Sequence, residues 1–186
     1  MRVIAGRARG RRLIAPHHSR RRGDTPVRPT SDLVRGAIFS ALASLRADMS
    51  RVLDLYAGTG ALGIEAISRG ADWCDFVEHD RLACETIREN LRLTGFENQA
   101  RVYQTTAVRA LEALHEPYTL VMADPPYEDK GALAVLELLT ERGIAIEGQT
   151  VLVLEHSARH EPIREIGGLA LVNSRRHGDS AISIYR

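Results

Sequence analysis

The tetrapeptide Asp124-Pro125-Pro126-Tyr127 has residue types suited to a reaction at a planar amine. It directly follows the apolar run YTLVMA, and ligands of open α/β sheets bind beyond the carboxyl ends of the strands. Two prolines fix φ and remove backbone donors, so the loop is stiff and its carbonyls can accept hydrogen bonds. Asp124 and a loop carbonyl could both accept from an exocyclic amine and pull its nitrogen toward tetrahedral geometry. Tyr127 offers a ring on which a base could stack, a contact worth about 1–3 kcal/mol.

A glycine-rich loop stands between the first expected strand of the sheet and the next helix. The segment DLYAGTGALG places Gly58, Gly60 and Gly63 in a G-x-G-x-x-G arrangement, where glycine lets the backbone turn sharply and approach a ligand. Dinucleotide sites and S-adenosylmethionine sites both use this motif. Asp54 favours the second, because its carboxylate would repel a pyrophosphate and attract the amino group of a methionine moiety. We therefore expect S-adenosylmethionine as the cofactor.

Glu78 ends the second expected strand, 20 residues after Gly58. A carboxylate at this position can accept hydrogen bonds from both hydroxyls of an adenosine ribose. Asp80 has a simpler alternative role as the cap of the following helix. Residues 124–127 could alternatively form only a rigid turn. The spacing of Asp54, the glycine-rich loop and Glu78 upstream is typical of methyltransferases and disfavours this alternative. Positioning should supply most of the rate, because a sulfonium cofactor already carries an activated methyl group.

The elements that would position these residues alternate between strand and helix from residue 51 onward. Expected strands cover residues 51–57, 72–78, 100–105, 118–123 and 150–156, and expected helices cover residues 60–70, 81–93, 108–115 and 131–143. Two further strand-like runs in residues 169–186 flank Gly178 and Asp179, which are typical of a hairpin turn. This order predicts an α/β fold with a doubly wound, mostly parallel sheet and an antiparallel C-terminal edge.

The residues ahead of this alternation are strongly basic. Residues 1–28 hold nine arginines and one acid, Asp24, although the whole chain has a net charge of +1. A basic arm on an acidic body indicates a polyanionic partner. We expect a short β-hairpin over residues 1–15, an irregular linker over residues 16–30 and a helix over residues 30–45. The candidate phosphate contacts are Arg7, Arg9, Arg11, Arg12 and Arg28, whereas residues 20–22 could equally be a solvated tail.

Other functional classes find no support in the sequence. No apolar run approaches the roughly 20 residues of a membrane span, and no apolar stretch follows the basic N-terminus as in a secretory signal. Cys74 and Cys84 fit neither a disulfide framework nor a zinc-ligand spacing. We therefore expect a cytosolic chain with reduced thiols, no metal and no membrane partner.

The combination of these motifs resembles the RsmD family, the bacterial 16S ribosomal RNA guanine-N2 methyltransferases. The matching segments are RVIAGRARGRRL, RPTSDLVRGAIFSAL, VLDLYAGTGALGIEAISRGA, FVEHD, ADPPY and HGDSAISIYR. The resemblance implies a seven-stranded, S-adenosylmethionine-dependent fold over residues 31–186, with residues 1–30 as a small RNA-contacting extension. It further implies the N2 amine of a guanine in 16S ribosomal RNA of the small subunit as the substrate. We expect the chain to act as a monomer.

The resemblance also assigns roles to residues. Cofactor binding falls on Asp54, Gly58, Gly60 and Glu78, with Ala107 near the adenine, and catalysis falls on Asp124, Pro125, Pro126 and Tyr127. Residues 28–32 would sit close to the active centre. The chain departs from the family at Gly36, where glutamate is usual, at Ser40, where asparagine is frequent, and at His177, where tyrosine is common. Thr106 and Ala107 stand where the family often places an asparagine or aspartate near the adenine.

Three alternatives remain open at this point. A DNA or other RNA adenine-N6 methyltransferase shares the motif of residues 124–127, but the chain lacks a sizeable domain for reading duplex sequence. A non-catalytic RNA-binding assembly factor would not need an intact cofactor loop. In a nucleotide-dependent oxidoreductase, Asp54 and residues 124–127 would have no functional role.

Overall fold

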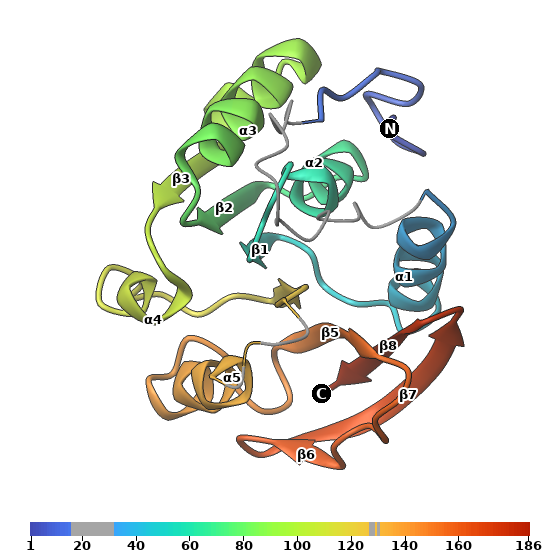
Figure 1. Cartoon of the computed structure of the whole chain (residues 1–186), viewed down its shortest axis with the longest axis vertical. Coiled ribbons are helices and arrows are strands. Elements are labelled where there is room, and N and C mark those ends of the chain that lie inside the picture. Colours follow the sequence, from blue (N-terminus) through green and yellow to red (C-terminus); the bar gives the residue numbers. More distant parts are fainter. Residues whose placement is uncertain (16–31, 127–128, 130) are drawn as a thin grey trace, which may run out of the picture.

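The eight strands of the sheet lie in the order β3-β2-β1-β4-β5-β8-β7-β6 in a computed structural model (Figure 1) that describes residues 1–15, 32–126, 129 and 131–186. Strands β1 to β5 run parallel, and β8, β7 and β6 extend the sheet in antiparallel fashion beyond β5. The strands are β1 Arg51–Leu55, β2 Trp73–Glu78, β3 Ala100–Gln104, β4 Leu120–Ala123, β5 Val151–Ser157, β6 Glu165–Ile166, β7 Leu169–His177 and β8 Ser180–Tyr185. The expected doubly wound, mostly parallel sheet is confirmed.

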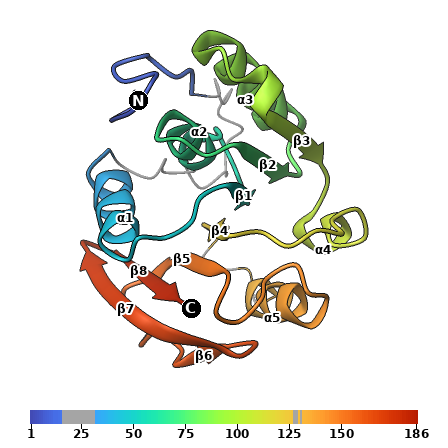
Figure 2. The same cartoon turned by 180° about the vertical axis from the view of Figure 1, so that it is seen from behind.

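Helices cover both faces of this sheet, as Figures 1 and 2 show from opposite sides. The helices are α1 Asp32–Ser44, α2 Ala61–Ser68, α3 Arg81–Thr94, α4 Ala107–Ala110 and α5 Ala132–Glu141, with a 3₁₀ turn η1 Glu97–Gln99. Alternate strand residues such as Val52 and Met122 join the core under α1, α2 and α3. Their neighbours Leu53 and Val121 join the core under α4 and α5. The central strands are therefore apolar on both faces, as a covered parallel sheet requires.

Local signals set the ends of α3. The Asp80 side chain accepts a hydrogen bond from the Ala83 N–H at 2.8 Å, which satisfies one of the free donors at the start of the helix. Gly95 ends it with φ 76, a conformation that glycine adopts without strain. The capping role considered for Asp80 is thus the one observed.

The structure departs from the expected elements in three places. A two-residue strand, β6, pairs with the start of β7 through the turn at Gly167 and Gly168, so the sheet has eight strands rather than seven. The expected helix over residues 108–115 is shorter, because α4 ends at Ala110 and turns follow. The expected hairpin over residues 1–15 keeps only a single antiparallel bridge, between Arg2 and Arg12.

Residues 1–15 form a strap that packs on the α2–α3 layer. The Glu65 carboxylate, in α2, accepts from the backbone N–H groups of Ile4 at 2.8 Å and Ala5 at 3.0 Å. Gly6 is required at the contact, because a Cβ there would lie 1.8 Å from the Ser68 carbonyl oxygen. Val3, Ala8 and Leu13 of the strap are buried in the same core cluster as α2. The boundary expected near residue 30 remains a prediction, since residues 16–31 lie outside the described part.

Among the described residues, no helix is long and apolar enough to cross a membrane. Both cysteines are buried free thiols. No group of three or more His, Cys, Asp and Glu side chains able to hold a metal ion occurs in residues 1–15, 32–126, 129 and 131–186.

Candidate active site

The carboxyl ends of neighbouring strands bring two candidate residues, Glu78 and Asp124, next to Tyr56. Leu55 of β1 is in register with Val77 of β2 and with Ala123 of β4. The next residue of each strand is therefore Tyr56, Glu78 and Asp124, respectively. Parallel pairing thus brings Glu78 and Asp124 to either side of Tyr56, as expected for a site at the carboxyl edge of the sheet.

The loop between β1 and α2 depends on its glycines. Gly58 and Gly60 have φ values of 55 and 74, in the left-handed region. A Cβ on Gly63 would lie 2.3 Å from the Phe76 ring, so only glycine lets α2 approach β2 this closely. Gly60 N–H donates to the Ala57 carbonyl at 2.7 Å and closes the turn. This backbone fits the close approach of a methionine moiety.

Asp54 is buried beneath this loop, with 1% of its surface exposed. Its carboxylate accepts from the Gly63 N–H at 2.8 Å and so fixes the first turn of α2. The pKa of Asp54 is raised to about 8, mainly by burial and in smaller part by the nearby carboxylates of Asp124 and Glu78, while the Gly63 hydrogen bond acts to lower it. A cationic group nearby would favour the ionised form, but the contact between Asp54 and an amino group remains a prediction.

Glu78 holds the same loop from the other side. One carboxylate oxygen accepts from the Gly58 N–H at 2.9 Å and the other from the Asp80 N–H at 2.8 Å. The ring of His79 adds a contact at 3.1 Å. A carboxylate oxygen has two lone pairs, so the oxygen bonded to Gly58 keeps one acceptor site for a ribose hydroxyl. The oxygen bonded to Asp80 also carries the His79 contact, which a second hydroxyl would have to replace. The two backbone bonds would fix the carboxylate in place before a ligand arrives.

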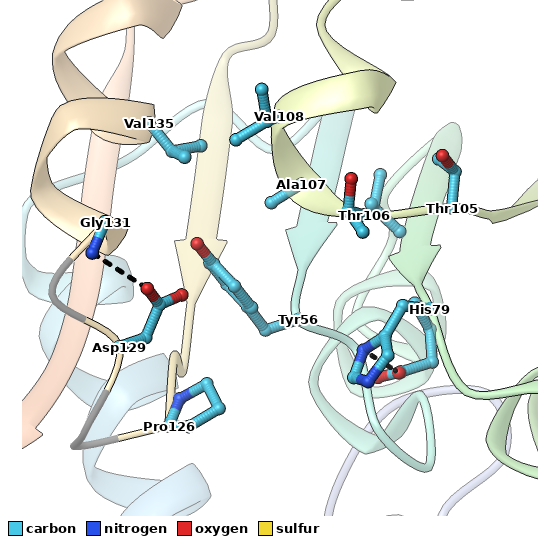
Figure 3. Close-up of a pocket in the computed structure, with 12 residues that line it drawn as sticks. Tyr56, His79, Thr105, Thr106, Ala107, Val108, Pro126, Asp129, Gly131 and Val135 are labelled. Atoms are coloured by element: carbon cyan, nitrogen blue, oxygen red, sulfur yellow. Dashed lines mark hydrogen bonds and ion pairs between the residues drawn. The ribbon is translucent and has the colours of Figure 1, made fainter.

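A cavity of about 250 Å³ lies next to Glu78 (Figure 3). Its lining is mostly apolar, as expected of a pocket for a planar ring. The lining residues are Tyr56, Val77, Glu78, His79, Thr105, Thr106, Ala107, Val108, Pro126, Asp129, Gly131 and Val135. Of the candidate cofactor residues, Glu78 and Ala107 therefore line the cavity, whereas Asp54, Gly58 and Gly60 do not.

Tyr56 is a member of the site that the sequence reading missed. Its side chain lies between the loop carrying Asp129 and the turn carrying Thr106 and Ala107 (Figure 3). Burial raises the pKa of Tyr56, and the Asp129 carboxylate raises it further, so the phenol stays protonated. Its φ of 65 is uncommon for a bulky residue, and such conformations cluster at functional sites. Its position directly after β1 is the signal that could have identified it.

The candidate catalytic loop leaves the sheet directly after β4. Asp124 is half-buried, Pro125 is buried and Pro126 is exposed at the cavity. The Pro126 carbonyl accepts from the Asp129 N–H at 2.8 Å, and the Asp129 carboxylate accepts from the Gly131 N–H at 2.8 Å. These bonds tie the loop to the start of α5. Tyr127 lies outside the described residues, so its stacking role remains a prediction.

Comparison with known proteins places the chain in one family. The family model described as Conserved hypothetical protein 95 matches residues 1–186. Ribosomal RNA small subunit methyltransferase D of Escherichia coli is 36% identical over 144 residues, which covers 77% of this chain and 68% of that enzyme. The chain belongs to the RsmD family. The resemblance found in the sequence is thereby confirmed.

Two further similar proteins cover this RsmD-family chain from end to end, and a third shares its fold. YlbH of Bacillus subtilis, provisionally named an rRNA methyltransferase, is 36% identical over 189 residues and covers 100% of this chain and 98% of itself. The solved structure of yhhF from Escherichia coli, provisionally described as a methyltransferase, has a TM-score of 0.83 at 30% identity, covering 100% of this chain and 96% of that one. An RNA methyltransferase of Salinibacter ruber, solved with S-adenosyl-L-homocysteine, shares the fold at 19% identity and a TM-score of 0.64, covering 85% and 92%.

The candidate RNA-contacting arginines of this RsmD-family chain are split by the structure. Arg7 donates to the Ile67 carbonyl at 3.1 Å and to the Gln99 side chain at 2.8 Å, and its guanidinium lies 5.1 Å from the centre of the Phe96 ring. These contacts anchor the strap at the C-terminal end of α2, which is the end opposite Gly60. Three others, Arg9, Arg11 and Arg12, are exposed on the strap. Arg28 lies outside the described residues, and all five RNA contacts remain predictions.

Proposed function

We propose that this chain transfers the methyl group of S-adenosylmethionine to the exocyclic N2 amine of a guanine in 16S ribosomal RNA of the small subunit. Membership of the RsmD family and relatives named for ribosomal RNA methylation support the reaction class. The observation that carries the proposal is the place of Asp124. Asp124 directly follows β4, whose neighbour β1 is directly followed by Tyr56 and whose next strand, β2, ends at Glu78. This places Asp124 next to the cavity proposed for the adenosine half of the cofactor.

The site fits the chemistry of this cofactor group by group. The two oxygens of Glu78 would accept from the ribose hydroxyls, and the apolar wall with Ala107 and Val108 would hold the adenine. The turn at Gly58 and Gly60 would let the methionine half lie against the backbone. When bound, the cofactor supplies a methyl group already activated by its sulfonium. The protein therefore needs to orient the acceptor rather than to generate a strong nucleophile.

Asp124 and the Pro125 carbonyl are the proposed acceptors for the two amine hydrogens of the guanine. The lone pair of such an amine is delocalised into the ring, and two hydrogen bonds from its N–H groups would draw it back onto the nitrogen. Asp124 would then be placed to take the proton that the nitrogen loses on methylation. Because proline fixes φ at residues 125 and 126, these acceptors would hold their geometry without reorganisation.

The direct test is product mapping. We would incubate the enzyme and labelled S-adenosylmethionine with small ribosomal subunits from cells that lack the activity, and with protein-free 16S ribosomal RNA in parallel. The expected result is label in N2-methylguanine at one nucleotide of the assembled subunit. Light scattering on the enzyme alone should give the mass of a monomer. Label in N6-methyladenine would support the adenine alternative, and no incorporation into either RNA would overturn the proposal.

A further inference from the structure

The outer strand β7 places arginines at the same edge of the sheet as Asp124. Leu154 of β5 is in register with Ala123, so the next residue, Glu155, lies beside Asp124. Glu155 pairs with Ile182 of β8, and Ile182 pairs with Arg175 of β7. Asp124 and Arg175 thus belong to one row across the carboxyl edge. With neighbouring strands about 4.8 Å apart, their backbones are roughly 14 Å apart.

Arg175 and its neighbour Arg176 are exposed. Neither makes an ion pair with any residue of the described part of the chain. Two exposed arginines of α3 differ in this respect, because Arg81 pairs with Glu85 and Arg92 pairs with Glu89, each at 2.6 Å. The β7 arginines therefore keep their donors available for an external anion.

None of the described residues that line the groove beside Arg175 is acidic. Arg175 and His177 line a shallow groove between β7 and α1, whose α1 side is made by Ala37, Ile38 and Ala41. The acid of α1, Asp32, already accepts from the guanidinium of Arg35 at 2.9 Å. Successive side chains of a strand point to opposite faces, so Arg176 extends the positive charge to the other face of the same edge.

The strap is less well placed for the nucleotides next to the target. The Arg7 N–H donates to the Ser68 carbonyl at 2.7 Å, at the last residue of α2. This end of α2 lies beside the amino ends of the strands, opposite Asp124. RNA contacts at this part of the strap would lie across the body of the protein from the target base, whereas Arg175 and Arg176 flank the acceptor side of the site.

We propose that the β7–β8 hairpin is a second RNA-contacting surface, on which Arg175 and Arg176 bind phosphates of the nucleotides that flank the target guanine. The inference rests on the proposed function. A base that leaves its stack to reach Asp124 carries its backbone to the mouth of the site, and phosphate contacts there would hold its register. Arginine suits this task because its planar fork binds two phosphate oxygens at once.

The test uses the full chain and three variants, Arg175→Gln, Arg176→Gln and the double variant. Arg92→Gln is the control, and its charge change equals that of each single variant. Binding to protein-free 16S ribosomal RNA and to small subunits is measured across a salt series. Each lost phosphate contact should reduce the slope of log affinity against log salt by about 0.7–0.9. The KM for subunits should rise in the double variant, while kcat and S-adenosyl-L-homocysteine affinity stay at the wild-type values. The Arg175→Lys variant should keep the slope, because it keeps the charge.

Two outcomes would overturn the proposal. One is a slope and KM in the double variant equal to those of Arg92→Gln. The other is a slope that changes with subunits but not with protein-free RNA, which would assign the contact to a ribosomal protein. Failure of the proposed function would look different, since the wild-type enzyme would then methylate neither substrate whatever the binding slopes.

Discussion

The side-chain amide of Asn90 donates to the carbonyl of Thr59 at 3.0 Å, inside the glycine-rich loop. The same amide donates to the Ile14 carbonyl at 3.0 Å, and its oxygen accepts from the Ile14 N–H at 2.7 Å. Asn90 is fully buried in α3. One side chain therefore fixes the proposed cofactor loop to the N-terminal strap, and the position of the loop depends on the strap.

Replacing Asn90 with aspartate should weaken cofactor binding. The Asn90→Asp variant keeps an acceptor for Ile14 but loses both donors and buries a charge. A buried group left unsatisfied costs about 1–3 kcal/mol, so we expect S-adenosyl-L-homocysteine affinity to fall about tenfold. Titration calorimetry at a temperature where the variant is folded measures this. The exposed Asn98→Asp is the control, and equal affinities for the two variants would show that the Thr59 contact does not support the loop.

Loss of the Glu78 carboxylate should affect the cofactor more strongly. Glu78→Ala leaves the Gly58 and Asp80 N–H groups without their acceptor and removes the proposed ribose contact. The dissociation constant of S-adenosyl-L-homocysteine should rise about 10–100-fold. Glu85→Ala, on the exposed face of α3, serves as the reference. An unchanged constant in Glu78→Ala would remove the ribose role.

Asp54 should make the unliganded protein less stable as pH rises. Its pKa is about 8 in the folded state and near 3.8 when solvated, so between these values the folded protein binds a proton that the unfolded chain has lost. The free energy of unfolding therefore falls across this window. Asp54→Asn has no such titration, and urea unfolding from pH 4 to pH 8 should show a smaller fall than in the wild type. Parallel profiles for the two proteins would contradict the protonated state.

Gly36 offers a stabilising substitution. It lies inside α1, and a Cβ at this position would meet no atom of the described residues within 4 Å. Gly36→Ala should raise the free energy of unfolding by about 0.5–1 kcal/mol, because alanine loses less conformational entropy in a helix. The midpoint of thermal unfolding should rise by about 1–4 °C. A lower unfolding midpoint for Gly36→Ala would contradict this, because it would mean that the added methyl group clashes with a neighbouring segment.

The sequence predicted what depends on local patterns. The parallel strands follow from their apolar runs, the end of α3 follows from Gly95, and the hairpin of β7 and β8 follows from Gly178. These features need only neighbouring residues to be specified. The position of Asp124 at the end of β4 also followed from its place directly after an apolar run, whereas Tyr56 at the end of the neighbouring strand was not predicted.

What escaped prediction depends on contacts between distant residues. Asn90 reads as an ordinary polar position of a helix, and only the fold brings Ile14, 76 residues away, to its side chain. The pair Glu165–Ile166 is too short to carry a strand pattern and pairs only because Gly167 and Gly168 reverse the chain. The anchoring of Arg7 by Gln99 likewise cannot be seen in a basic stretch of sequence.

The central claim is that Asp124 acts on the acceptor amine rather than on the cofactor. Single-turnover methyl transfer to small ribosomal subunits by Asp124→Ala, at saturating S-adenosylmethionine, tests it most directly. We predict a rate lower than the wild-type rate by about 10²–10³-fold, with S-adenosyl-L-homocysteine affinity within about threefold of the wild-type value. A near-normal rate, or a loss of rate fully explained by weaker cofactor binding, would contradict the account.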